Sequence, residues 1–136
     1  PAPEEGEWPG PPCYCGRTGC IETFLSGPAL ERDYLSLGGP QMGAREIAAR
    51  AEAGEGIARA ALERYEHRFA RALTAILNIL DPDVVVLGGG VSNIERIYEN
   101  VPRLLAPFGN EPLRTRLVKA KHGDSSGVRG AAWLWG

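Results

Sequence analysis

Residues 78–93 read Asn-Ile-Leu-Asp-Pro-Asp-Val-Val-Val-Leu-Gly-Gly-Gly-Val-Ser-Asn, and this stretch decides the fold of the chain. Its centre, residues 84–87, is a short apolar run rich in β-branched residues, which predicts a strand buried on both faces. A helical pattern ends just before the strand because Pro82 cannot continue a helix. Ser92 and Glu95 have the spacing of a capping box, so we expect a new helix to open at Ser92. The stretch therefore predicts a helix, a strand, a glycine turn and a second helix in succession.

The turn in this stretch consists of Gly88, Gly89 and Gly90. Because glycines carry no side chains, a phosphate or ribose can lie against their backbone amides at the N-terminus of the next helix. A dinucleotide-binding fingerprint would need another glycine at position 93, which is Asn93, so that pattern is not met. The turn is compatible with a nucleotide site and equally with a tight strand-to-helix connection that binds no ligand.

Length and composition narrow the class of protein. A chain of 136 residues with 43% hydrophobic content is expected to form one domain. Its net charge of −2, with both signs mixed, gives no electrostatic support for binding nucleic acid or an anionic membrane. Because no apolar run approaches the roughly 20 residues that span a bilayer, we expect a soluble, cytoplasmic protein. The chain begins with Pro1 rather than Met, so we expect it to start inside a longer polypeptide.

All the cysteines of the chain fall within eight residues, at Cys13, Cys15 and Cys20. An odd number of clustered thiols argues against a disulfide framework and suits zinc, which takes four tetrahedral Cys or His ligands. The spacing is tighter than the common Cys-x2-Cys knuckle, and the alternative is three reduced thiols without a metal. His67 lies within a predicted helix and His122 far along the chain, so the fourth ligand is not identified.

Glu22 directly follows the last cysteine of this cluster. A carboxylate that is fixed beside a metal-binding loop can accept hydrogen bonds from a polyol. The alternative is a solvated glutamate in the first turn of a helix, where the helix dipole favours negative charge. The residues alone slightly favour this second interpretation.

A long helix is predicted from near Glu55 to Leu80, because its apolar residues recur every three to four positions. We expect its charged residues to form a solvated face: Glu63, Arg64, Glu66, His67, Arg68 and Arg71. Other helices are expected at 21–37 (two, broken at Gly27-Pro28), 44–53, 93–108 and 128–135, and a second strand at 115–119. Two strands joined through a helix predict a βαβ unit.

Residues 123–127 fit the Gly-x-Ser-x-Gly pattern of a hydrolase nucleophile, between a predicted strand and helix. The hydrolase order requires an acid and then a histidine after the serine, and the remaining residues contain neither. We therefore expect Ser125 or Ser126 to cap the last helix instead.

Taken together, these segments resemble the ROK family of bacterial sugar kinases and repressors. Residues 13–22, Cys-Tyr-Cys-Gly-Arg-Thr-Gly-Cys-Ile-Glu, match the family signature Cys-x-Cys-Gly-x-x-Gly-Cys-x-Glu at every fixed position. Residues 80–90 resemble the family's nucleotide-side strand and turn, and residues 121–132 resemble the tail of its fructokinase branch.

The resemblance implies an α/β fold, namely the C-terminal part of an actin/hexokinase-like (ribonuclease H-like) sugar kinase with two lobes. Residues 1–20 would form a zinc-binding loop, 21–80 a helical part, and 81–136 the nucleotide-side βαβ unit and final helix. The resemblance further implies roles for individual residues. Cys13, Cys15 and Cys20 would be zinc ligands, and Glu22 would bind sugar hydroxyls. Gly88, Gly89 and Gly90 would form the wall of the adenosine site.

The chain also departs from the family pattern. The family's zinc histidine precedes the first cysteine, and residues 1–12 contain no histidine. Its catalytic aspartate and phosphate loop belong to the N-terminal half, which this sequence does not include. The segment alone is therefore expected to be inactive, whereas the full-length parent would transfer a phosphoryl group from Mg²⁺-bound ATP to a hexose, predicted to be fructose. The resemblance also implies a homodimer.

Two alternatives remain open. The parent protein would instead be a ROK-type sugar-sensing transcriptional repressor if a DNA-binding domain lies upstream. A weaker alternative is an NADP-binding module, with the glycine turn on the pyrophosphate and Lys119 or Lys121 near a 2′-phosphate.

Overall fold

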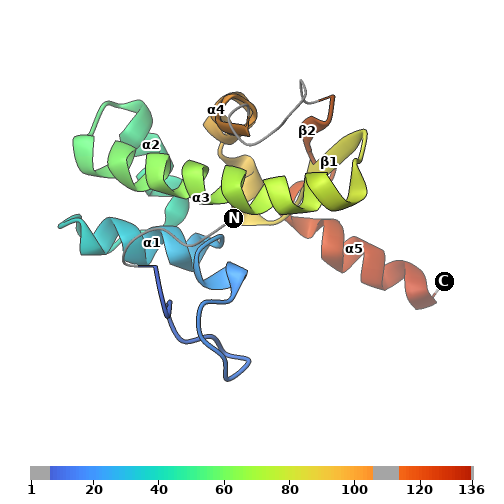
Figure 1. Ribbon diagram of the computed structural model, residues 1–136, viewed down its shortest axis with the longest axis horizontal. Helices are drawn as coiled ribbons and strands as arrows, with labels where there is room; N and C mark the ends of the chain where they lie inside the picture. Colours follow the sequence, from blue (N-terminus) through green and yellow to red (C-terminus); the bar gives the residue numbers. More distant parts are fainter. Residues whose placement is uncertain (1–6, 106–113, 136) are drawn as a thin grey trace.

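The computed structural model describes residues 7–105 and 114–135. The end of the helix that the sequence predicts over 93–108 lies outside the described residues. Two parallel strands, β1 (Val84–Leu87) and β2 (Arg116–Lys119), form a small sheet beside a set of helices (Figure 1). The α-helices are α1 (Gly27–Ser36), α2 (Ala44–Glu52), α3 (Gly56–Leu80), α4 (Arg96–Leu105) and α5 (Ser126–Ala132). Single 3-10 turns are η1 (Ile21–Thr23), η2 (Gly90–Asn93), η4 (Gly123–Ser125) and η5 (Trp133–Trp135).

Helix α3 is the central element, and α1, α2 and α4 all pack against it (Figure 1). Its predicted apolar side supplies much of the core, including Leu62, Tyr65, Leu73 and Leu77. The helix ends at Leu80 because Asp81 adopts a left-handed conformation, with φ 41°, and Pro82 cannot continue the helix. None of the described helices is long and apolar enough to cross a membrane.

The solvated face predicted for α3 is only partly solvated. His67 is exposed, as expected. The prediction is wrong for Glu66, which is 1% exposed, and for the side chains of Arg68 and Arg71, which are 14% and 15% exposed. All three face charged partners on other segments, which compensate for their burial.

The strands β1 and β2 pair in parallel, from Val84 opposite Arg116 to Leu87 opposite Lys119. Helix α4 lies between them in the sequence, so the predicted βαβ connection is confirmed. The expectation that β1 is buried on both faces is wrong for the described chain, because Val86 is 60% exposed. β1 has a single partner strand among the described residues, which leaves part of its surface uncovered.

The capping box predicted at Ser92 does not form. Ser92 Oγ instead donates to the carbonyl of Gly89 at 2.6 Å, inside turn η2. The Glu95 carboxylate accepts from Lys119 Nζ at 2.9 Å, on the neighbouring strand. Because both side chains are engaged elsewhere, α4 begins at Arg96 rather than at Ser92.

The two helical segments predicted over 21–37 are present as η1 and α1, but the break lies at residues 24–26, and Gly27-Pro28 begins α1. Ser26 accepts a hydrogen bond from the backbone amide of Ala29 at 3.2 Å, and Pro28 occupies the first turn, where no amide is needed. The preceding helix is reduced to η1.

At the other end of the chain, Ser125 does not cap α5, because its hydroxyl donates to the carbonyl of His122. The side chain of Ser126 lies outside the described residues.

Candidate functional site

The cysteine loop brings three potential metal ligands together. The Sγ atoms of Cys13, Cys15 and Cys20 all lie within 4.8 Å of one another, and those of Cys15 and Cys20 are 3.5 Å apart. Thiolates bound tetrahedrally to zinc at about 2.3 Å hold their sulfur atoms about 3.8 Å apart, so this donor set fits a zinc ion with one further ligand.

Backbone hydrogen bonds shape this loop. The amide of Cys13 donates to the carbonyl of Arg17 at 2.7 Å, and the amide of Gly16 donates to the carbonyl of Cys13 at 3.0 Å. Gly16 has a φ of +83°, which other residues adopt only with strain. This tight turn directs the cysteine side chains toward one point.

The thiols of the loop differ in acidity. A hydrogen bond from the backbone of Arg17, followed by contacts with the other two thiols, lowers the pKa of Cys15. The pKa of Cys20 is raised to about 11, chiefly because its thiol shares a hydrogen bond with Cys15. Cys15 therefore ionises more readily than Cys20, and a bound cation would replace the remaining thiol protons.

We expect protein purified without added metal to contain close to one zinc ion per chain, because three preorganised sulfur ligands bind Zn²⁺ strongly. Elemental analysis measures this content, and a variant with Cys15→Ser is expected to lose most of the metal. An absence of zinc, together with rapid alkylation of all three thiols, would contradict the assignment.

Glu22 lies in η1, directly after the cysteine loop, and is exposed. The pKa of the exposed Tyr14 phenol is raised, chiefly by the charge of the Glu22 carboxylate. A carboxylate and a phenol at the solvent-facing side of the loop can accept and donate hydrogen bonds to a polyhydroxylated ligand. Sequence reasoning missed Tyr14, whose only signal is its position between two cysteines.

The glycine turn lies open to solvent beside the start of α1. A Cβ atom added at Gly88, Gly89 or Gly90 would meet no atom within 4 Å, so a ligand can reach their backbone. A hollow of about 360 Å³ separates the turn from Ser26 and Gly27 at the start of α1 and from Tyr65 and Phe69 of α3.

A second hollow, of about 770 Å³, borders the same turn on the side of α2. Its polar lining includes Arg45, Glu52, Asn93 and Lys119. The two hollows share Gly27, Gly90 and Val91, so the start of α1 and the glycine turn form the ridge between them. The sequence did not predict that the start of α1 borders the glycine turn. The only signal for it was the Ser-Gly-Pro sequence at the start of that helix.

The two predicted sites, far apart in the sequence, both lie near the start of α1. Only Phe24, Leu25 and Ser26 separate η1, which carries Glu22, from α1, whose first residues border the glycine turn. The structure thus joins the cysteine loop, Glu22 and the glycine turn through one short segment. Such an arrangement presents a carboxylate for hydroxyl groups and an exposed glycine backbone for phosphate or ribose.

Comparisons with known proteins agree with this arrangement. The sequence model of the ROK family matches residues 6–136. An N-acetyl-D-glucosamine kinase of Yersinia pseudotuberculosis is 44% identical over 127 residues, which cover 93% of this chain and 42% of that protein. The chain therefore spans well under half the length of this curated relative.

Two solved structures extend the likeness to the fold. A ROK hexokinase from Thermus thermophilus superposes with a TM-score of 0.75 at 31% identity, covering 91% of this chain and 44% of that one. A ROK family glucokinase from Streptomyces griseus, solved with glucose and AMPPNP, superposes with a TM-score of 0.78 at 26% identity. This match covers 92% of the chain and 47% of the glucokinase.

Proposed function

This chain belongs to the ROK family, and on that premise we propose that it forms the C-terminal part of a kinase that transfers a phosphoryl group from ATP to a hexose. The observation that carries the proposal is the position of Glu22, which lies in η1 directly after a loop whose thiols fit zinc. Only three residues separate η1 from α1, whose start borders the open glycine turn. The glucokinase solved with glucose and AMPPNP, a sugar and an ATP analogue, supports the same pairing of ligands.

The residues of this chain would act by binding and positioning. Zinc held by Cys13, Cys15 and Cys20 would fix the shape of the loop, and Glu22 would accept hydrogen bonds from sugar hydroxyls. The backbone of Gly88, Gly89 and Gly90 would face the nucleotide. Phosphoryl transfer relies mainly on positioning and charge neutralisation, and Mg²⁺ bound to ATP supplies part of that neutralisation. The catalytic aspartate and the phosphate loop would come from sequence outside this chain.

The identity of the hexose has two candidates. Fructose is the sugar that the tail at residues 121–132 predicts by its resemblance to the fructokinase branch. The name of the Yersinia relative, at 44% identity over most of this chain, favours N-acetylglucosamine instead. Both sugars therefore belong in the assay, and ADP release by the complete protein tests the kinase proposal itself.

The two alternatives predict other outcomes. A sugar-sensing repressor would bind the hexose through the same Glu22 loop but would release no ADP. An NADP-binding module would prefer NADP over ATP, and it is less well supported, because Lys119 already pairs with Glu95 at 2.9 Å. Lys121 is exposed and lies just beyond β2.

We also propose that the chain self-associates. Ile79 and Leu80 of α3 and Trp133 and Leu134 near the end of the chain are all at least 69% exposed, a large amount of uncovered apolar surface. Light scattering on the isolated chain is expected to give the mass of a dimer or a larger species. A monomer at high concentration would contradict this expectation.

A further inference from the structure

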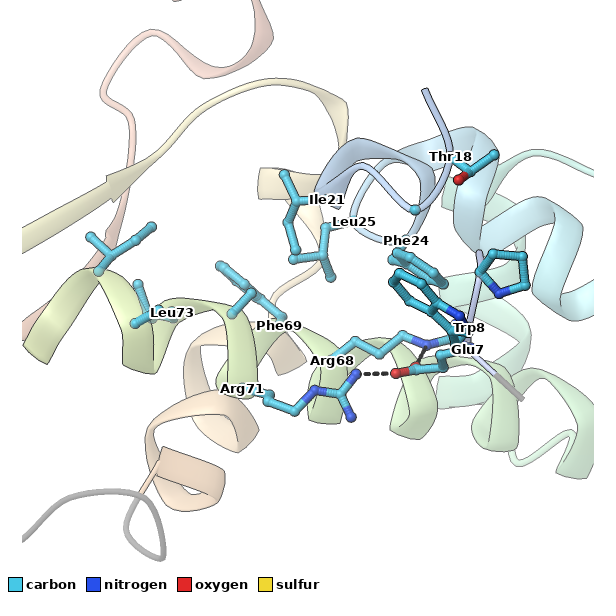
Figure 2. Close-up of a pocket in the computed structure, with 15 residues that line it drawn as sticks. Glu7, Trp8, Thr18, Ile21, Phe24, Leu25, Arg68, Phe69, Arg71 and Leu73 are labelled. Atoms are coloured by element: carbon cyan, nitrogen blue, oxygen red, sulfur yellow. Dashed lines mark hydrogen bonds and ion pairs between the residues drawn. The ribbon is translucent and has the colours of Figure 1, made fainter. Parts of the chain in front are cut away.

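Arg68 of α3 holds both flanks of the cysteine loop (Figure 2). Its Nε donates to the carboxylate of Glu7, before the loop, at 2.7 Å. Its guanidinium carbon lies 5.4 Å from the ring centroid of Phe24, two residues after Glu22, in a cation–π contact. Its Nη1 donates to Asp33 of α1 at 2.7 Å, which fixes the guanidinium itself.

These contacts are shielded from water. The side chains of Arg68, Glu7 and Asp33 are 14%, 8% and 14% exposed, so their charge-assisted hydrogen bonds are stronger than surface ion pairs. Arg68 and Glu7 also line a groove of about 600 Å³ between the loop and α3 (Figure 2). The cysteines can shape the loop internally, whereas Arg68, together with Arg71, which also pairs with Glu7, sets where the loop sits on the rest of the protein.

Glu66, two residues earlier in α3, holds a different segment. Its carboxylate is buried and accepts hydrogen bonds from Arg96 Nε at 2.5 Å, Arg96 Nη2 at 3.1 Å and Asn100 Nδ2 at 3.0 Å. Arg96 is the first residue of α4, and Asn100 lies one turn further on. Because a buried ion pair adds little net stability over an apolar pair, its main contribution is a fixed position for the start of α4.

Hydrogen bonds continue from α4 to the glycine turn. The hydroxyl of Tyr98 donates to the carbonyl of Ser92 at 2.7 Å. Ser92, which is 2% exposed, in turn donates through its hydroxyl to the carbonyl of Gly89 at 2.6 Å. The orientation of the peptide groups at Gly89 therefore depends on the position of α4, and through it on Glu66.

We infer that Arg68 and Glu66 are separate positioning residues, Arg68 for the sugar-binding loop and Glu66 for the nucleotide-binding turn. Residues two apart in an α-helix point roughly 200° apart around its axis, so one rigid helix can hold the two segments independently. In Figure 1, α3 lies between α4 on one side and the cysteine loop on the other. This inference rests on the proposed kinase function, and it adds residues that touch neither ligand.

The test is a crossed kinetic comparison on the complete, zinc-loaded protein. Glu66→Gln is expected to raise the KM for ATP about fivefold or more and to leave the KM for the hexose within about twofold. Arg68→Met is expected to show the opposite pattern, and Arg68→Lys, which keeps the charge, should recover part of the loss. Glu63→Gln and Arg59→Met, exposed changes on the same helix, should alter neither constant.

A second variant guards against a folding defect. Should Glu66→Gln not fold, Arg96→Lys retains the charge beside Glu66 but removes the two-pronged hydrogen bond, and it should raise the KM for ATP selectively. If the wild-type protein is active and each variant changes both KM values equally, or changes neither, this inference is overturned while the proposed function stands. Absence of ADP release from the wild-type protein with every hexose would overturn the proposed function and this inference with it.

Discussion

Replacing Glu22 with glutamine is expected to raise the KM for the hexose about tenfold or more while leaving the KM for ATP nearly unchanged. The substitution keeps the shape of the side chain and removes its charge. Each charge-assisted hydrogen bond to a sugar hydroxyl contributes about 1.5–3 kcal/mol, and a carboxylate can accept two of them. Because Glu22 is exposed at the end of the cysteine loop, the change should not disturb the core.

The matched control for this substitution is Glu63→Gln, an identical chemical change at an exposed position of α3. In steady-state kinetics with the complete protein, the two variants should differ in the KM for the hexose and in no other constant. Sugar kinetics that are the same in Glu22→Gln and in the wild type would remove Glu22 from the sugar site.

Replacing Gly89 with alanine is expected to lower the free energy of unfolding by roughly 1–3 kcal/mol. Gly89 has φ 80° and ψ 176°, a backbone conformation that is essentially restricted to glycine. A Cβ atom there would meet no atom within 4 Å, so the whole cost arises from the backbone and none from a steric clash.

Gly88 and Gly90 provide the comparison for this prediction. Both have room for a Cβ atom and neither has a positive φ, so alanine at either position should be close to neutral. Urea unfolding of the three alanine variants measures the difference. A Gly89→Ala midpoint equal to that of Gly90→Ala would show that the turn does not depend on this conformation.

Local signals in the sequence predicted the parts of the structure that local physics controls. The β-branched run and Pro82 marked β1 and the end of α3, because strand preference and the missing amide act on neighbouring residues. Similarly, the short spacing of the cysteines, with glycine at the turn between them, allows their sulfur atoms to lie within 4.8 Å of one another.

Features that depend on distant partners were not predictable in this way. The spacing of Ser92 and Glu95 suggested a helix cap. In the folded chain, however, Ser92 hydrogen-bonds to Gly89 and Glu95 hydrogen-bonds to Lys119. Glu66 belongs to a charged stretch of α3 that the sequence marked as solvated, and it is buried because Arg96 and Asn100 of α4 reach it. Both errors concern residues that hold the glycine turn in place.

The most direct measurement is ADP release by the complete, zinc-loaded protein, with Mg²⁺ and ATP and each of four hexoses: fructose, N-acetylglucosamine, glucose and mannose. A ROK sugar kinase is expected to release ADP in proportion to the amount of at least one of these sugars, and to stop when the sugar is omitted. Saturable sugar binding without ADP release from any of the four would contradict the kinase proposal and favour the repressor.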